Sequence, residues 1–244
     1  MLKEIIQGFS CSYQKNCRDH EIDMIICSRG GRGTADLVAQ INWAGLPRRP
    51  ELYVMGYSDV TMLLCAMSAK GYGRPIAGPV VSSLASLNKN IMPQIKKMFH
   101  GEALAPIKLK AVRPGECAGK TLAGLLNRFV LSVRNKYGVD TKGKIIIIEC
   151  VRSTPEKIRS DLDELVKEGF FTGASGVVFG HFLQSGKREV INGIFNDFAQ
   201  KVKIPVYRGL PFGHNSLHIA IDFAQMGKKY EAVRLRFIHR RCAS

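Results

Sequence analysis

The chain has 244 residues, a length that corresponds to one large domain or two small ones. Hydrophobic residues make up 45% and charged residues 23% of the sequence, which argues against long disorder, collagen-like repeats and coiled coils. The longest aliphatic run is Ile145–Ile148, far short of the roughly 18 to 20 apolar residues that a membrane crossing needs. We therefore expect a soluble protein with no membrane partner.

Cysteine usage and the amino-terminal residues indicate the compartment. The first 17 residues contain no sustained apolar segment and no small-residue cleavage site, so they do not resemble a secretory signal. Seven cysteines, an odd number without C-x-x-C spacing, fit free thiols better than a disulfide framework or a zinc cage. We expect a cytoplasmic protein without a metal site.

The chain carries 36 Lys and Arg against 20 Asp and Glu, a formal net charge of +16, which favours anionic partners. The basic excess is spread over both halves, so a dedicated nucleic-acid arm is not expected. The one local build-up surrounds residues 233–238, where Arg234 and Arg236 alternate with apolar residues. This alternation predicts a strand with a basic, solvated face. Surface charge for solubility is the favoured interpretation, and a patch for an anionic ligand or nucleic acid is the alternative.

The first half of the chain alternates short aliphatic runs with helical patterns, as is typical of a parallel sheet covered by helices. The first strand ends in a glycine-rich loop, and the second turns through Gly56–Asp59 into a helix that is expected to close at Gly71. The expected elements are strands at 24–27, 52–55 and 75–78 and helices at 37–41 and 60–69.

The pattern changes after residues 108–120, a stretch rich in Pro, Gly and charge that is the candidate domain boundary. The segment Ser153–Glu156 carries an N-cap, a first-turn proline and an acid placed for a capping box, which start one of the helices that follow. The expected elements are strands at 145–148, 177–179, near 206 and at 233–238, a helix that stops at Gly169 and a helix around 191–202. We therefore predict an α/β protein with two domains, residues 1–112 and 113–244.

Ser58 is the residue that most suggests chemistry. It lies on a strand-to-helix turn after Gly56, where its hydroxyl is held clear of the sheet and the following amides can stabilise an oxyanion. The match to the G-x-S-x-G elbow of hydrolases is partial, because Val60 occupies the position of the last glycine. On spacing alone, a simple helix N-cap at Ser58 or Asp59 is the favoured interpretation.

Glu149 and His214 stand at two further places where function is common. Glu149 ends the isoleucine strand, and the carboxyl ends of strands in open α/β sheets face the ligand crevice. A carboxylate there could orient a histidine, or it could be a solvated strand end. His214 lies in a turn-forming loop and could act as a general base, although a single loop histidine is more often a surface residue. His181 and His218 are weaker candidates.

Gly30 and Gly31 belong to a glycine-rich loop between a strand and a helix. Such a loop lets the backbone approach a ligand closely and could cradle a phosphate or a carboxylate. The loop is not G-x-G-x-x-G, because Ala35 occupies the third glycine position, and no Lys-Ser/Thr pair of a P-loop follows. A nucleotide cofactor is therefore not expected.

Four segments carry a resemblance to a known family. Residues 26–33 resemble a strand followed by an RGGxG loop, residues 54–61 resemble a G-Y-S-D-x-T nucleophile turn, and residues 211–214 resemble a P-x-G-H histidine loop. Residues 142–149 resemble a strand that ends in a catalytic glutamate. In order and spacing these motifs are similar to the LD-carboxypeptidase family of serine peptidases, which includes the microcin C immunity peptidases.

The resemblance implies roles for individual residues. Ser58 would be the nucleophile, His214 the base that takes its proton, and Glu149 the acid that orients the imidazole. The oxyanion would be held by the Asp59 amide and by an amide of the Gly30–Gly31 loop. The implied fold is a flavodoxin- or Rossmann-like parallel domain that carries the serine. A second α/β domain with a mixed sheet would carry the other two residues, with the site in the cleft between them.

The implied reaction is hydrolysis of the L,D-peptide bond to a terminal D-alanine in muropeptides during peptidoglycan recycling, through an acyl-enzyme and without a cofactor. An anionic muropeptide or peptide substrate agrees with the basic charge of the chain. Two alternatives stay open. One is an immunity-type peptidase of the same family that opens a peptidyl-nucleotide antibiotic, and the other is a truncated, inactive remnant or basic binding protein.

The resemblance also implies two strand–helix units before the RGGxG strand, whereas 22 residues precede Asp23 here. We therefore expect an N-terminally shortened chain with an incomplete first sheet. Such a sheet would expose an edge and apolar surface, which invites association, as in a homodimer, or instability.

Overall fold

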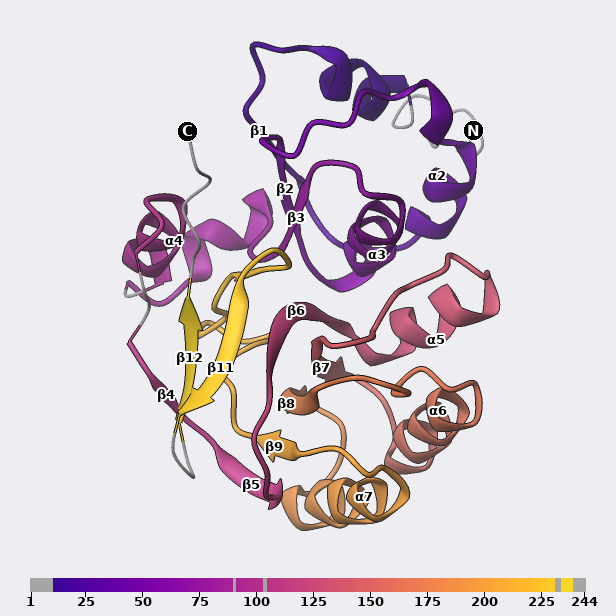
Figure 1. The fold of residues 1–244 in the computed structure, drawn as a ribbon, viewed down its shortest axis with the longest axis vertical. Coiled ribbons are helices and arrows are strands. Elements are labelled where there is room, and N and C mark those ends of the chain that lie inside the picture. The colour runs from indigo at the N-terminus through magenta and orange to yellow at the C-terminus, as the bar shows by residue number, and fades with distance from the viewer. Residues whose placement is uncertain (1–10, 90, 103–104, 231–233, 239–244) are drawn as a thin grey trace.

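A computed structural model describes residues 11–89, 91–102, 105–230 and 234–238. Its strands form two sheets with helices packed against them, so the chain has the mixed α/β fold that the sequence predicts (Figure 1). Residues 11–18 are helical as well. Within the described ranges, no helix is long and apolar enough to span a membrane.

The first sheet has four strands in the order β1-β2-β3-β10. The first three strands are parallel, and β10 pairs antiparallel with β3. The parallel strand–turn–helix units predicted from the first half of the sequence are confirmed, and the order places β1 at one end. The elements are β1 (Met24–Ile26), α2 (Thr34–Gln40), β2 (Tyr53–Gly56), α3 (Thr61–Lys70), β3 (Arg74–Ala77) and β10 (Ile221–Asp222), with short 3₁₀ turns η1 (Trp43–Gly45), η2 (Ser58–Val60) and η3 (Val81–Ser86).

The second sheet has eight strands in the order β4-β12-β11-β6-β7-β8-β9-β5. Its central strands β6, β7, β8 and β9 are parallel, and the flanking strands are antiparallel, so the sheet is mixed as expected. Helices α5, α6 and α7 line one face of the parallel strands (Figure 1). The elements are β4 (Ile107–Lys108), β5 (Lys110–Arg113), β6 (Ala118–Leu125), α5 (Leu126–Arg134), β7 (Ile145–Val151), α6 (Pro155–Lys167), β8 (Gly176–Leu183), α7 (Arg188–Lys201), β9 (Val206–Arg208), β11 (Met226–Tyr230) and β12 (Arg234–Ile238).

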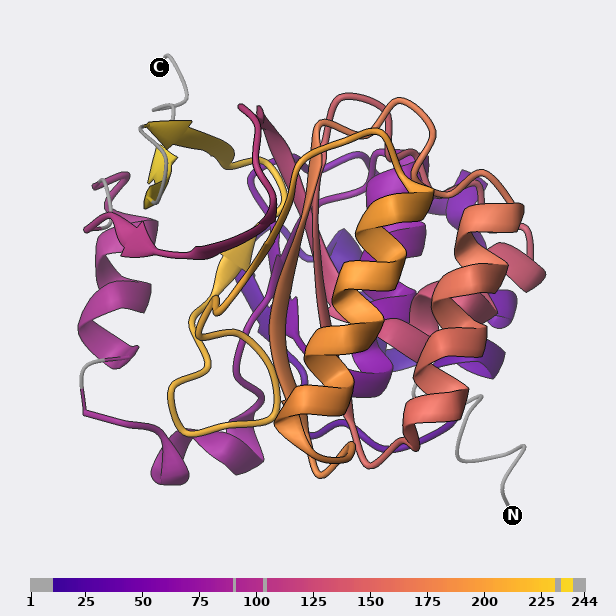
Figure 2. The same cartoon turned by 90° about the horizontal axis from the view of Figure 1, so that it is seen from below.

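The core of the second sheet surrounds β7. Ile145–Ile148 are fully buried, and each such side chain contributes about 1.5–3 kcal/mol of transfer free energy. Phe179 of β8 stacks on Phe195 of α7 with ring centroids 4.0 Å apart, and Phe198 meets Phe179 edge-on at 5.4 Å. In the view from below, α7 (orange) and α6 (salmon) lie against one face of this sheet (Figure 2). This packing fixes the carboxyl end of β7.

The segment that contains β10 returns from the second sheet to the first. Asp222 is fully buried, and its Oδ2 accepts hydrogen bonds from Arg74 Nε at 2.8 Å and Nη2 at 2.5 Å. The backbone oxygen of Asp222 accepts a hydrogen bond from Thr121 Oγ1 of β6 at 2.8 Å. One residue is thus bonded to both sheets.

Several elements differ from the sequence-based prediction. Residues 108–120, expected to be a link between domains, contain β5 and the start of β6, and α4 (Ile91–Phe99) was not predicted. The sequence of β5 shows no clear alternation of apolar and polar residues, because β5 is a half-exposed strand at the edge of the sheet. The two-domain division at residues 112 and 113 stays a prediction.

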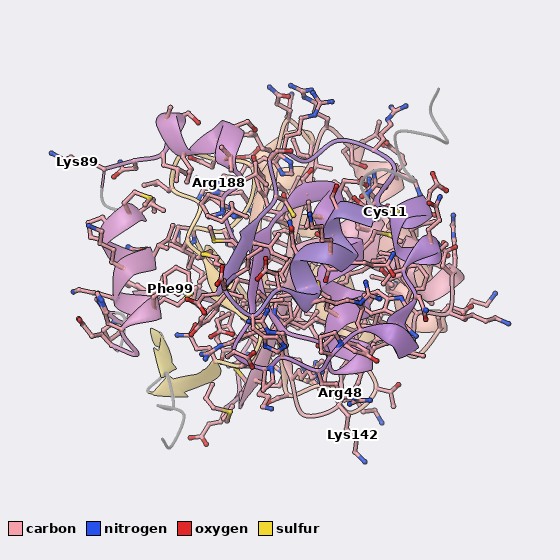
Figure 3. The ribbon with its side chains drawn as sticks, turned by 90° about the horizontal axis from the view of Figure 1, so that it is seen from above. Cys11, Arg48, Lys89, Phe99, Lys142 and Arg188 are labelled. Carbon is pink, nitrogen blue, oxygen red and sulfur yellow. The ribbon has the colours of Figure 1, made fainter. Side chains whose placement is uncertain are left out.

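Basic side chains occur at widely separated places on the described surface. Lys89 and Lys142 are exposed and point outward at opposite sides of the molecule (Figure 3). The strand expected at 233–238 is present as β12, but Val233 and the side chains of β12 lie outside the described residues. The predicted basic face therefore stays a prediction.

Candidate active site

Ser58 stands in a strained turn at the end of β2. It begins η2, and its φ of 62° lies in the left-handed region that residues other than glycine rarely adopt, at a cost of about 1–3 kcal/mol. The turn is tight because Gly56 packs against Val60: a Cβ at position 56 would lie 2.7 Å from Val60 Cγ1. Valine therefore fills the position where the hydrolase elbow has its last glycine.

The N-cap interpretation of Ser58 and Asp59 is wrong. The N-cap residues of η2 and α3 are Tyr57 and Val60, and neither position has a side-chain cap hydrogen bond. The Ser58 hydroxyl instead faces His214, and the Asp59 carboxylate turns toward α2.

Asp59 anchors the Ser58 turn to two helices. Its Oδ2 accepts hydrogen bonds from Thr34 N at 3.0 Å and from Thr34 Oγ1 at 2.8 Å. Its Oδ1 lies 2.6 Å from Arg128 Nε of α5, an ion pair whose angle is not that of a hydrogen bond. Asp59 is buried, so these partners compensate the cost of taking its charge out of water.

The structure brings Ser58, His214 and Glu149 into one hydrogen-bonded line. His214 Nε2 lies 3.0 Å from Ser58 Oγ, and His214 Nδ1 lies 2.9 Å from Glu149 Oε2. With the ring proton on Nδ1 donated to the carboxylate, Nε2 is free to accept the serine proton. The serine follows a strand of the first sheet, and the glutamate belongs to β7 of the second, so the line joins the two sheets.

Glu149 is not a solvated strand end, because it is only 1% exposed. Burial raises the pKa of its carboxyl group, and the hydrogen bond from His214 opposes that rise. Gly213 has a φ of 125°, and a Cβ there would lie 2.9 Å from Glu149 Cβ. Glycine at this position allows the histidine loop to cross directly over the acid.

His218 supports the loop that carries His214, a role that the sequence analysis did not predict. It is buried, and its Nδ1 accepts a hydrogen bond from Gly213 N at 2.9 Å. Burial lowers the pKa of His218 to about 3, so the ring is neutral near pH 7. Tyr57 packs against both imidazoles, with ring centroids 4.9 Å from His214 and 4.7 Å from His218. The only signal in the sequence for the burial of His218 is that its neighbours, Leu217 and Ile219, are apolar.

The Gly30–Gly31 loop touches the serine. A Cβ at Gly30 would lie 2.9 Å from Ser58 Cβ and 3.2 Å from its Oγ, so only glycine fits without moving the hydroxyl. Within the described part of the chain, the amides of Gly30, Gly31 and Asp59 donate to no acceptor. Unused amides beside a nucleophilic oxygen are the donors that an oxyanion needs.

These residues open onto a cleft of about 550 Å³, within the size range of small-ligand sites. It is lined by strand ends of the second sheet, by residues that follow strands of the first sheet and by the η3 turn. The described ranges contain no group of three or more His, Cys, Asp or Glu side chains placed to hold a metal ion. The lining residues are Gly31, Tyr57, Ser58, Ser83, Ser86, Leu87, Val151, Arg152, Leu183, Gln184, His214, Asn215, Ser216 and His218.

Two family models match the chain. The LD-carboxypeptidase N-terminal domain matches residues 12–76, and the LD-carboxypeptidase C-terminal domain matches residues 118–227. The Ser58 turn lies in the first match, and Glu149 and His214 lie in the second.

Curated relatives carry corresponding names. The chain is 27% identical over 218 residues to a probable murein peptide carboxypeptidase of Bacillus subtilis, covering 84% of this chain and 67% of the relative. It is 23% identical over 233 residues to the murein tetrapeptide carboxypeptidase of Pseudomonas aeruginosa, covering 89% and 75%.

Solved structures share the fold. The muramoyltetrapeptide carboxypeptidase from Oxalobacter formigenes aligns with a TM-score of 0.83 and 19% identity over 95% of this chain and 82% of that chain. The microcin C7 self immunity protein MccF in complex with aspartyl sulfamoyl adenosine aligns with a TM-score of 0.79 and 15% identity over 96% and 81%.

Proposed function

Because the chain belongs to the LD-carboxypeptidase family, we propose that it is a serine carboxypeptidase that releases terminal D-alanine from muropeptides in the cytoplasm. The bond cleaved joins an L-configured centre to D-alanine, and the reaction serves peptidoglycan recycling. The observation that carries this proposal is the continuous line from Ser58 Oγ through His214 to Glu149 inside a cleft.

Acylation begins when Ser58 Oγ attacks the scissile carbonyl carbon and His214 Nε2 takes the hydroxyl proton. Glu149 stabilises the imidazolium through Nδ1, as its buried position 2.9 Å away allows. The amides of Asp59 and the Gly30–Gly31 loop donate to the oxyanion. His214 then gives its proton to the departing amine of D-alanine, which leaves an ester on Ser58.

Deacylation repeats these steps with water. His214 takes a proton from a water molecule, whose oxygen attacks the ester carbonyl through a second oxyanion. Collapse of this intermediate returns the proton to Ser58 Oγ and frees the shortened peptide. Over the whole cycle His214 passes one proton from Ser58 to the amine of D-alanine and one from water back to Ser58, and no group is oxidised or reduced.

A second candidate is supported by the MccF structures, which are complexes with glutamyl sulfamoyl guanosine and aspartyl sulfamoyl adenosine. The same serine chemistry would then cleave the amide of a peptidyl- or aminoacyl-nucleotide. The acylation and deacylation steps are identical, and only the leaving group differs.

The test is to incubate the purified protein with a muropeptide that ends in L-centre–D-alanine and to measure free D-alanine by liquid chromatography. Aminoacyl sulfamoyl adenosine is treated in parallel. Wild-type protein should release D-alanine, and Ser58→Ala should abolish release while its thermal unfolding temperature stays nearly unchanged.

The outcomes separate the candidates. Release by Ser58→Ala would remove this serine from the mechanism. Cleavage of the nucleoside alone would select the second candidate. If neither compound is cleaved and Ser58 does not react with a serine-directed probe, the chain is a binding protein.

A further inference from the structure

Two residues with strained backbones lie side by side in the lining of the cleft. Arg152 follows β7 directly and has a φ of 51°, and Gln184 follows β8 directly and has a φ of 50°. The two strands are parallel neighbours, and Arg152 N donates to Leu183 O at 3.0 Å. The two strand ends are therefore fixed side by side.

The side chains of these residues are joined as well. Arg152 Nε donates to Gln184 Oε1 at 3.0 Å. This bond uses one donor of the guanidinium and orients the rest, since the group is planar. No other side-chain hydrogen bond or ion pair links Arg152 to a described residue, so both Nη nitrogens keep their donors for a ligand.

The strain is concentrated at the cleft. Four described residues other than glycine have a positive φ, and three of them, Ser58, Arg152 and Gln184, line the cleft. Each such conformation costs about 1–3 kcal/mol, and strain of this kind is typical of ligand clamps. A glycine would adopt both conformations without cost, yet long polar side chains occupy them.

The charge of the cleft points to the ligand. Among the described residues that line the cleft, Arg152 is the only Lys or Arg, and none is Asp or Glu. His218 is neutral near pH 7, because burial lowers its pKa to about 3. The permanent charge of the lining is therefore positive. Arg152 carries it just past the end of β7, three residues after Glu149.

We propose that Arg152, oriented by Gln184, binds the terminal carboxylate of the substrate and makes the enzyme specific for a chain end. A planar guanidinium with two free nitrogens matches a carboxylate in bidentate geometry. A carboxypeptidase must distinguish a terminal residue from an internal one, and the carboxylate is the group that only the terminus carries. This inference rests on the proposed function.

The experiment compares two substrates that differ only at the end: a muropeptide that ends in D-alanine and the same peptide that ends in D-alaninamide. Arg152→Gly deletes the guanidinium and relieves the strained φ, so the protein should stay folded. We expect kcat/KM for the free acid to fall about 100-fold, mostly through KM, because a charge-assisted pair is lost. The amide should be hydrolysed equally by both proteins.

Two further variants sharpen the result. Gln184→Leu should raise KM for the acid by a smaller factor with kcat nearly unchanged, since Gln184 only orients Arg152. Arg159→Gln is the matched control, because Arg159 lies outside the cleft lining in an exposed ion pair with Asp197. It removes the same charge and should leave both substrates unaffected.

The outcomes distinguish this inference from the proposed function. If wild-type protein cleaves the acid and the amide equally well, or if Arg152→Gly loses both alike, the enzyme stands and the carboxylate site is overturned. If neither peptide is cleaved, the affinities of Ser58→Ala for the two peptides, measured by calorimetry, test the carboxylate site. Tighter binding of the acid that requires Arg152 supports the site, and equal or absent binding refutes it.

Discussion

Glu149 and Ser58 face the same imidazole, but the chain positions them by different means. Glu149 follows four fully buried isoleucines in a seven-residue strand at the centre of the larger sheet. Ser58 follows a four-residue strand next to β1, the end of the smaller sheet. Hydrophobic burial thus holds the acid, whereas a strained turn, the Gly30 contact and the Asp59 ion pair hold the nucleophile. Substitutions on the two sides should therefore fail in different ways.

The largest effect is expected from the strand-held acid and the imidazole that it orients. His214→Ala and Glu149→Ala should each lower kcat/KM by about 10⁴-fold, because the three groups act as one unit. For the same reason the double variant should be scarcely worse than either single variant. Steady-state D-alanine release measures all three. A double variant that lost the product of the two single losses would contradict this account.

The turn-held side should be sensitive to a single methyl group. Gly30→Ala places a Cβ 2.9 Å from Ser58 Cβ and must displace the hydroxyl, so kcat should fall about 100-fold. Gly193→Ala on α7 is the control, because a Cβ there meets nothing within 4 Å. Its kcat should be that of the wild type. Equal kcat in both variants would show that the Gly30 contact does not position the serine.

The ionic anchor of the turn is expected to contribute to stability. Asp59→Asn leaves the largely buried Arg128 without its counter-ion, and the free energy of unfolding should fall by about 2 kcal/mol. Asp197→Asn breaks an exposed pair with Arg159 and should change it by less than about 1 kcal/mol. Urea titrations of both variants measure the difference. If the two losses were equal, the turn would not depend on this anchor.

The effect that is smallest near pH 7, and that grows only in acid, is a pH dependence of the histidine loop. The folded-state pKa of His218 is lowered to about 3 from an ordinary value of 6.5, so between these pH values the unfolded chain binds the extra proton. Stability is therefore lost as the pH falls through this window, by up to about 1.4 kcal/mol per pH unit.

His218→Gln removes this titration, and its amide can still form a hydrogen bond with the backbone of Gly213. Its free energy of unfolding should fall less steeply between pH 6.5 and 4 than that of the wild type. The raised pKa of Glu149 acts in the opposite direction, but it is present in both proteins and cancels in the difference. Parallel slopes would mean that His218 is accessible to solvent.

Short sequence patterns predict many of the features that the structure shows. The buried isoleucine strand, the Ser58 turn and the histidine loop each have a signal within about ten residues, and motif resemblance named the three groups that the structure brings together. The strand β10 has no such signal, because two residues pair with a strand nearly 150 positions away. The left-handed conformations of Arg152 and Gln184 were also hidden, since neither residue type favours them.

The double attachment of Asp222 has a consequence for biosynthesis. The sheet that carries Ser58 receives its last strand from residues 221–222, so a ribosome must translate most of the chain before that sheet can be completed. The active site would then be completed late in translation, after Glu149 and His214 have been added to the chain. A nascent chain that stalled before Asp222 was added would contain Ser58, Glu149 and His214. It would lack the hydrogen bonds of Asp222 that connect the two sheets.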